Sequence, residues 1–181
     1  MIYQLNDEYF VRSLQETDID GGYPSWFEDQ DVCKYNSHGK FFKTRSHFQA
    51  YLNGLNSESQ VVWAICHRED GHVGNIALQI ISFINRNADF GIVMGDSEHW
   101  GKGVAYEAAK KVIYHGFCKL NLERIYCATA ATNVPMRNLA KKLGMVEEGC
   151  RRAHLYLDGE WVDMVDYGIL RREYDLLGCK T

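Results

Sequence analysis

The stretch "DSEHWGKGVAYEA", from Asp96 to Ala108, decides the fold of this 181-residue chain. An apolar run that is typical of a strand, "DFGIVMG" (Asp89 to Gly95), comes directly before it. Two glycines then flank Lys102, and a helical spacing of apolar residues begins at Gly103. Glycine leaves backbone N–H groups uncovered, and the dipole of the following helix favours an anion, so this turn can bind phosphate. The alternative is a plain turn that needs glycine only for positive φ.

The alternation of strands and helices continues toward the C-terminus. A second strand, "RIYCATA", spans Arg124 to Ala130, and Asn133 is placed to cap the next helix, with Pro135 in its first turn and Gly144 at its end. The helix that begins after Gly103 presents one apolar face, made of Ala105, Ala108, Ala109, Val112, Ile113 and Gly116. The second carries an apolar stripe made of Met136, Leu139, Ala140 and Leu143.

The flanking regions supply further strands. Upstream, we expect a strand at Tyr9–Gln15, a helix at Thr44–Leu55, and a hairpin that joins Gln60–His67 to Val73–Ile84. Downstream, "CRRAHLYLDGEW" turns at Asp158-Gly159 and is followed by the β-rich "DMVDYGIL". This order predicts an α+β fold: one domain over residues 1–181, with a mixed central sheet and helices on both faces.

Composition excludes several classes of protein. The chain is 46% hydrophobic with a net charge of −4, and it has no run of Lys and Arg, which argues against a nucleic-acid partner. We find no signal peptide and no segment that could span a membrane. The six cysteines are scattered without a C-x-x-C pair, and the histidines do not pair at metal-ligand spacing. We therefore expect reduced thiols, no metal and a cytoplasmic location.

Three strings carry a family resemblance: "DFGIVMGDSEHWGKGVAYEA", "LERIYCATAATNVPMRNLAKKLGMVEEG" and "DGEWVDMVDYGILRREY". Together they resemble the GNAT superfamily of N-acetyltransferases, and most of all the branch with ribosomal-protein N-terminal acetyltransferases and antibiotic or amino-sugar acetyltransferases. The match runs from about Tyr9 to Tyr174. Its most specific part is W-G-K-G-x-A-x-E-A followed by N-x-x-x-R-N-x-x-x-K-x-G. The resemblance implies an acetyl-CoA site between two splayed strands.

The resemblance also implies which residues hold that cosubstrate. The turn amides receive the pyrophosphate, and the pantetheine arm pairs like an extra strand with the end of the preceding strand. The backbone N–H of Met94 then polarises the thioester carbonyl and stabilises the oxyanion. Asn133 contacts the cofactor arm, acts as a helix cap, or does both. The full set of expected cofactor residues is Ile92, Val93, Met94, Trp100, Gly101, Lys102, Gly103, Val104, Ala105, Asn133 and Asn138.

The chain departs from the family pattern at three positions. Trp100 stands where the pyrophosphate motif commonly begins with Arg or Gln, and Met136 stands where Ser is common. Ala140 replaces the Tyr that serves many relatives as general acid toward the leaving thiolate. That role is therefore not transferred to this chain, and another group or water must protonate the thiolate.

The chemistry needs a neutral amine, which attacks the thioester directly through a tetrahedral intermediate. A protein α-amine, with a pKa near 8, needs only modest help from a base, and a lysine amine near 10.4 needs more. The base candidates are Asp89, Glu98, His38 and His154, chosen by chemical type and expected nearness to the split strands. A solvated or structural role is the alternative for each of them.

The segment Tyr23–Phe42, "YPSWFEDQDVCKYNSHGKFF", is rich in aromatic, Asn and His side chains and is expected to bind the acceptor. It resembles family members that act on nucleotide-linked amino sugars, and we assign substrate contacts to Trp26, Tyr35, Asn36 and His38. Its aromatic residues instead form core in the alternative interpretation. A small-molecule amine is the preferred acceptor, a protein N-terminus is the chief competitor, and a non-catalytic acyl-CoA-binding module is the third hypothesis. A homodimer is left open.

Overall fold

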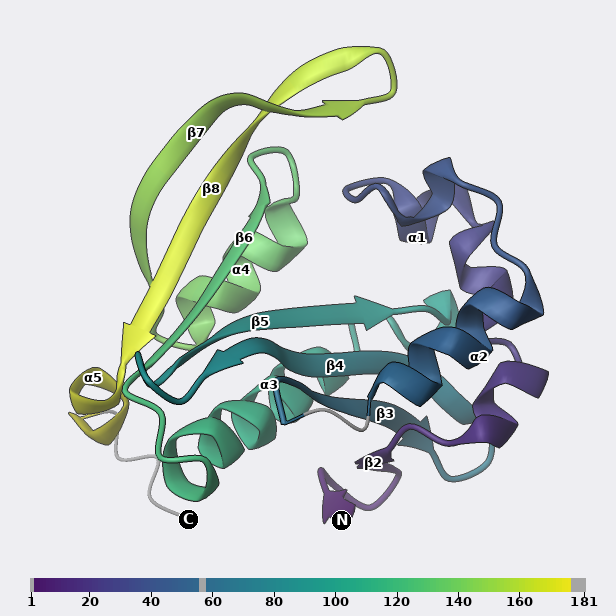
Figure 1. The fold of residues 1–181 in the computed structure, drawn as a ribbon, viewed down its shortest axis with the longest axis horizontal. Helices are drawn as coiled ribbons and strands as arrows, with labels where there is room; N and C mark the ends of the chain where they lie inside the picture. Colours follow the sequence, from purple (N-terminus) through teal and green to yellow (C-terminus); the bar gives the residue numbers. More distant parts are fainter. Residues whose placement is uncertain (1, 56–57, 177–181) are drawn as a thin grey trace.

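The computed structural model of the chain describes residues 2–55 and 58–176. One sheet of eight strands runs through it in the order β1-β2-β3-β4-β5-β6-β8-β7 (Figure 1). The strands are β1 (Ile2–Gln4), β2 (Tyr9–Ser13), β3 (Val61–His67), β4 (Gly71–Ser82), β5 (Asn87–Met94), β6 (Arg124–Ala130), β7 (Val146–Leu157) and β8 (Glu160–Leu170). The α-helices are α1 (Gln30–Cys33), α2 (Arg45–Gly54), α3 (Val104–Tyr114), α4 (Val134–Lys142) and α5 (Arg171–Leu176). Short 3-10 turns are η1 (Glu16–Asp20), η2 (Pro24–Phe27), η3 (His38–Lys40) and η4 (Ser97–His99), and η5 (His115–Lys119) is a π-helical turn.

The sheet is antiparallel except at one junction. Strands β1 to β5 form a meander, and β6, β8 and β7 form a second antiparallel group. The two groups meet where β5 pairs in parallel with β6, and this pairing covers only Asn87–Asp89 against Arg124–Tyr126. Beyond it the two strands diverge, and Figure 1 shows β6 rising away from β5. The splayed strand pair that the sequence predicts is therefore present.

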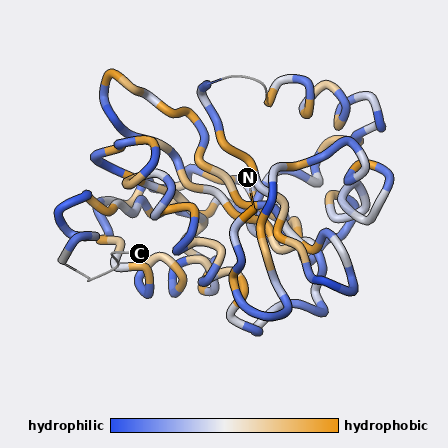
Figure 2. The backbone as a smooth tube through the Cα atoms, turned by 90° about the horizontal axis from the view of Figure 1, so that it is seen from below, coloured by the Kyte–Doolittle hydropathy of each residue, from blue (hydrophilic) through white to orange (hydrophobic). Residues whose placement is uncertain are grey.

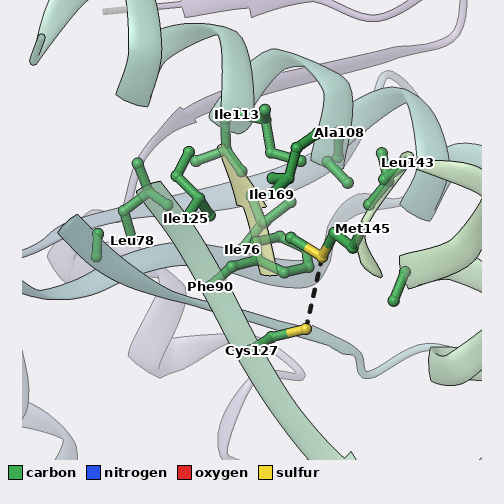
Figure 3. Packing of buried hydrophobic residues seen from close by; sticks show 14 of the residues in the cluster. Ile76, Leu78, Phe90, Ala108, Ile113, Ile125, Cys127, Leu143, Met145 and Ile169 are labelled. Carbon is green, nitrogen blue, oxygen red and sulfur yellow. Dashed lines mark hydrogen bonds between the residues drawn. The ribbon is translucent and has the colours of Figure 1, made fainter. Parts of the chain in front are cut away.

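The main core lies between one face of the sheet and α3. Because side chains alternate along a strand, Ile76 and Leu78 of β4 and Phe90 of β5 share this face. Ala108 and Ile113 of α3 pack against them, with both fully or almost fully buried (Figure 3). The same figure shows the buried Cys127 thiol, which contacts the Met145 sulfur at 3.7 Å. This packing confirms the apolar helix face that the sequence predicts.

The opposite face of β3–β5 is covered by the segment that connects β2 to β3. A second, smaller cluster of Ile19, Tyr23, Trp26 and Phe48 forms there, with α2 contributing Phe48. Helices therefore lie on both sides of the sheet, as expected. Figure 2 shows hydrophobic backbone gathered where the strands cross the middle of the molecule and hydrophilic stretches in the outer loops.

A buried polar network fastens this covering segment to the sheet. Arg12 of β2 donates two hydrogen bonds to the Asp18 carboxylate, at 2.8 and 2.6 Å, and His72 Nδ1 lies 3.4 Å from the same carboxylate. Burial would raise the pKa of Asp18, but hydrogen bonds from Arg12 and from the Gln15 N–H hold it below its usual value. The carboxylate therefore stays charged, and it ties η1 to β2 and β4.

Local details differ from the sequence-based expectations. Strand β1 was not anticipated, and the 3-10 turn η1, with Gln15 as its N-cap, follows β2. The cysteines within the described residues, Cys33, Cys66, Cys118, Cys127 and Cys150, are all free, and Cys179 lies outside those residues. None of the described helices is long and apolar enough to cross a membrane.

The contact between Gly95 and Trp26 leads to a stability prediction. A Cβ at Gly95 would lie 1.8 to 2.2 Å from atoms of the Trp26 ring, so Gly95→Ala must displace the indole. We expect a loss of about 1 to 3 kcal/mol, as for other overpacked sites. Thermal unfolding measures it.

Gly54→Ala is the matched control, because nothing lies within 4 Å of a Cβ at that exposed position. Its effect should stay within about 0.5 kcal/mol. Equal stability of the two variants would contradict the role given to the Gly95–Trp26 contact.

Candidate active site

A large cavity opens where β5 and β6 diverge. Its volume is about 1170 Å³, which is above the usual range of about 300 to 1,000 Å³ for a site that binds one small ligand. One side is built from β5, the turn before α3 and the start of α4, and the other side from residues of the segment between β2 and β3. The cavity is therefore large enough for two ligands that meet over β5.

The inner edge of β5 offers unpaired peptide groups to this cavity. The Gly95 N–H donates to Val73 O at 3.0 Å, so the neighbouring odd-numbered residues of β5 direct their peptide groups toward β4. The peptide groups of Ile92 and Met94 therefore point the other way, where β6 has already diverged. The carbonyl of Met94 accepts a hydrogen bond from Trp100 Nε1 at 3.0 Å. The Met94 N–H is left facing the gap, as an oxyanion donor would require.

The glycine turn has the shape of an anion cradle. Gly101 and Gly103 both have positive φ, 74° and 81°, and no atom lies within 4 Å of where a Cβ would stand on either. Gly103 is also the N-cap of α3, so the first amides of that helix lack intrahelical acceptors. Gly101, Gly103, Val104 and Ala105 line the cavity, whereas the Lys102 side chain does not. The turn can thus bring N–H groups to a phosphate without steric hindrance.

The start of α4 forms the next part of the wall. Asn133 lines the cavity and caps α4: its Oδ1 accepts from the Met136 N–H at 3.2 Å, and its Nδ2 donates to Thr129 Oγ1 at 3.0 Å. Both ends of its amide are thus engaged by the protein. Asn138 is exposed on α4 and does not line the cavity. Ala140 is fully buried in the main core, where a small side chain packs against the sheet.

The side of the cavity formed by the segment between β2 and β3, where the sequence predicts acceptor binding, is aromatic and polar. Tyr35, Asn36 and His38, three of the predicted substrate residues, all line it. The fourth, Trp26, does not: it is 6% exposed and packs beneath the wall, beside His72 and over Gly95. Tyr23, Phe27 and Tyr51, which were not among the predicted substrate residues, complete the aromatic wall.

The charges on this wall are mostly positive. The lining contains Lys34 and Lys43 and only one carboxylate, that of Asp31. Lys43 Nζ lies 4.0 Å from the centre of the Phe27 ring, and burial lowers the pKa of this lysine. Lys34 Nζ lies 5.6 Å from the Tyr35 ring. The wall therefore favours a ligand that carries negative charge over one that carries several positive charges.

Asp89 is the base candidate whose environment changes its chemistry. It lies on β5 at the last residue pair before the strands diverge, opposite Tyr126. Burial raises the pKa of Asp89 to about 6, against the opposing effect of Arg151. Asp89 in turn adds to the effect of burial in raising the pKa of Tyr126. A carboxylate with this pKa can accept a proton near neutral pH, although Asp89 does not itself line the cavity.

The other three base candidates are less suitably placed. Glu98 is exposed on η4 and lies outside the cavity wall. His154 is exposed on β7 and is hydrogen-bonded to Arg151 at 3.2 Å. His38 lines the cavity, where loss of hydration and the nearby Lys43 lower its pKa. His38 is thus neutral at physiological pH and is the only one of these three that faces the ligand space.

Two polar residues of the sheet floor were missed by sequence reasoning. Asn75 and Gln79 of β4 line the cavity, on the same face as Gly91 of β5. The Asn75 side chain is oriented by the buried His72, whose Nε2 lies 2.9 Å from Asn75 Oδ1. Both are polar residues in an otherwise apolar strand, and this was the signal that could have identified them. A polar residue in a buried strand needs a hydrogen-bond partner, which a ligand can supply.

One hydrogen bond joins the β7–β8 hairpin to the segment between β2 and β3. Lys40 Nζ, at the end of η3, donates to the carbonyl oxygen of Tyr156, near the end of β7. Tyr156 stacks in turn beside Trp161 of β8, with ring centres 5.2 Å apart. The tip of the β7–β8 hairpin is thereby joined to the segment that covers the acceptor side.

No cysteine of the described residues lines the cavity. Burial raises the pKa of Cys66 to about 11 and that of Cys127 to about 12, so both remain protonated thiols. A thiolate nucleophile is therefore lacking among these residues, and the arrangement suits direct attack by a second substrate.

Comparison with known proteins agrees with this geometry. Residues 9–146 match the family model of the acetyltransferase (GNAT) domain. The chain is 31% identical over 169 residues to the uncharacterized N-acetyltransferase p20 of Bacillus licheniformis. This alignment covers 91% of this chain and 93% of that protein. It is 32% identical over 126 residues to the putative ribosomal N-acetyltransferase YdaF of Bacillus subtilis, with 70% and 64% covered.

Solved structures show the same fold. The crystal structure of spermidine N-acetyltransferase from Vibrio cholerae, in complex with CoA and spermine, superposes with a TM-score of 0.83 at 23% identity and covers 93% of this chain and 99% of that one. With the glycine turn, the diverging strands and the family match in agreement, the chain belongs to the GNAT family of N-acetyltransferases.

Proposed function

We propose that this protein transfers the acetyl group of acetyl-CoA to a small-molecule amine that also carries negative charge, such as an amino sugar linked to a nucleotide. The observation that carries the choice of acceptor is the charge of its wall, with Lys34 and Lys43 against the single carboxylate of Asp31. Aromatic faces next to Asn36 and His38 suit a sugar ring or a base, which stack and accept hydrogen bonds.

The cosubstrate fits the other half of the cavity. The free peptide groups of Ile92 and Met94 can pair with the amides of a pantetheine arm. The turn from Gly101 to Ala105 suits its pyrophosphate, because the glycines leave the N–H groups open and α3 begins there. When bound, acetyl-CoA supplies the activated acetyl group. The Met94 N–H then holds the negative charge that develops on the acetyl oxygen.

Two competing acceptors fit less well. Relatives whose alignment covers 56% of this chain are named spermidine N-acetyltransferases. A polyamine needs carboxylates, however, and Asp31 is the only carboxylate on the acceptor wall. A protein N-terminus is suggested by the name of YdaF. It would have to fit beside the β7–β8 hairpin, whose Leu155 lines the cavity and whose Tyr156 accepts a hydrogen bond from Lys40.

The acceptor is tested by following thiol release from acetyl-CoA with a nucleotide-linked amino sugar, spermidine and an N-terminal peptide. We expect the highest kcat/KM with the nucleotide-linked amine. Replacing Lys43 by Gln should raise KM for that amine roughly tenfold, the effect of losing one charge-assisted contact. The same change at Lys119, an exposed residue of η5, is the control.

Each alternative outcome has a distinct meaning. A preference for spermidine or for the peptide would refute the proposed acceptor while leaving the acetyl transfer intact. Tight acetyl-CoA binding without turnover of any amine would instead support a non-catalytic binding module.

The glycine turn provides a test of cosubstrate binding. Asn and Asp both tolerate the positive φ at Gly103, so Gly103→Asn and Gly103→Asp differ mainly by one negative charge. We expect Asp to weaken acetyl-CoA binding roughly tenfold or more relative to Asn, since like charges about 4 Å apart at a surface repel by about 1 to 4 kcal/mol. Calorimetric titration measures the two Kd values. Equal affinities would place the pyrophosphate elsewhere.

The raised pKa of Asp89 predicts two pH effects. If Asp89 accepts the amine proton, kcat/KM rises with pH through about 6, and Asp89→Asn removes that rise. Glu98→Gln, at the base candidate outside the cavity, should leave it in place. An unchanged acid limb in Asp89→Asn would exclude Asp89 as the base.

The second effect concerns stability. The folded pKa of Asp89, about 6, lies above the ordinary value of 3.8, so the folded state binds the proton more tightly. The associated stabilisation is complete at low pH and is lost as pH rises through 6. Asp89→Asn should therefore raise the unfolding temperature relative to the native protein at pH 8 but not at pH 4, whatever its role in catalysis.

A further inference from the structure

Two histidines that are distant in the sequence meet an aspartate at the end of the sheet, next to the glycine turn. His67 ends β3, Asp70 lies in the turn to β4, and His99 ends η4, just before Trp100. One donor atom from each of the three lies within 4.8 Å of the other two. His99 lines the cavity beside the glycine turn, but the proposed acetyl transfer gives no role to any of the three residues, so their meeting calls for a separate explanation.

The orientation of His99 suits a ligand. Its side chain is 2% exposed, and the hydroxyl group of Tyr9 lies 2.7 Å from Nδ1, which fixes the ring. Nε2 is thereby aimed at two carboxylates, with Asp70 Oδ2 at 3.4 Å and Asp96 Oδ2 at 3.7 Å. Both distances exceed the roughly 2.7 to 2.9 Å of a charge-assisted hydrogen bond. Nε2 therefore faces two carboxylates at distances longer than that of a charge-assisted hydrogen bond.

The spacing suits a tetrahedral cation. Ligand atoms about 2.0 to 2.1 Å from a tetrahedral zinc ion lie about 3.4 Å from one another. The separation of His99 Nε2 from Asp70 Oδ2 has this value, and that from Asp96 Oδ2 is close to it. His67 Nδ1 lies 2.6 Å from Asp70 Oδ2, so these two atoms must separate by about 0.8 Å to reach the tetrahedral spacing. Asp70 is 54% exposed in a turn, so the adjustment meets little resistance.

We propose that His67, Asp70 and His99 bind a divalent transition-metal ion of the zinc type, with Asp96 as a further carboxylate at the site. Two imidazoles with carboxylates select such an ion over Mg²⁺ and Ca²⁺, which prefer oxygen ligands alone. Tyr9 acts on the metal through His99, by accepting the Nδ1 proton and leaving Nε2 free to coordinate. This proposal departs from the sequence-based expectation of no metal, which considered only spacing along the chain.

The position of the site gives it a structural role. His67 and Asp70 belong to the β3–β4 turn, whereas Asp96 and His99 lead into Trp100 and the glycines. A bound ion joins these two turns and restrains the segment that carries the indole hydrogen bond to Met94.

The test uses protein without an affinity tag, freed of metal and titrated with Zn²⁺ by calorimetry. We expect one equivalent to bind and the unfolding temperature to rise with added Zn²⁺. Asp70→Asn should weaken binding at least about tenfold, since even partners of metal ligands contribute 10- to 100-fold. Glu69→Gln removes the same charge from the same exposed turn outside the site and should bind Zn²⁺ like the native protein.

Titration with Co²⁺ reports the geometry, because a tetrahedral site gives intense visible absorption that His67→Gln should remove. The absence of saturable Zn²⁺ binding to the native protein, or equal affinity in Asp70→Asn and Glu69→Gln, would overturn the proposal. In either case the three residues form only a hydrogen-bonded network. Neither result bears on acetyl transfer, which the acceptor and acetyl-CoA titrations test separately.

Discussion

The short parallel ladder between β5 and β6 is the constraint on which the site depends. Only three residue pairs, Asn87–Asp89 with Arg124–Tyr126, join the two halves of the sheet. A longer ladder would consume the peptide groups of Ile92 and Met94 in strand pairing. Because it stops at Asp89, a wedge-shaped space remains in which polar backbone must find a partner other than a strand. The cavity, the free Met94 N–H and the half-buried Asp89 all follow from this divergence.

The acceptor wall depends on a different kind of support. It is held to the sheet by a buried ion pair between Arg12 and Asp18, and by Trp26, which occupies the space that Gly95 leaves open. Buried ion pairs stabilise poorly in general but are costly to break from one side, so they favour one arrangement over others. The wall is therefore fixed where it meets β2 and β4.

Sequence reasoning succeeded where the signal was local. Spacing and residue types that suit one conformation predicted the glycine turn, helices α3 and α4, strand β6 and the cap at Asn133. The structure confirms them. It failed where the outcome depends on residues that are distant in the chain. Trp26 was predicted to touch substrate but is buried because Gly95 accommodates it. The raised pKa of Asp89 and the meeting of His67 with His99 likewise come from packing, which no periodicity reveals.

The pairing of β2 with β3 has an evolutionary consequence. The two strands are neighbours in the sheet, with Ser13 opposite Trp63, so the acceptor wall is an excursion whose two ends meet. Such an excursion can be exchanged for another without disturbing the meander on either side. The residues that face the proposed coenzyme come from β5 to α4 and lie outside it. New acceptors can therefore arise by replacement of one contiguous segment, while the half of the molecule that handles the acetyl donor is inherited unchanged.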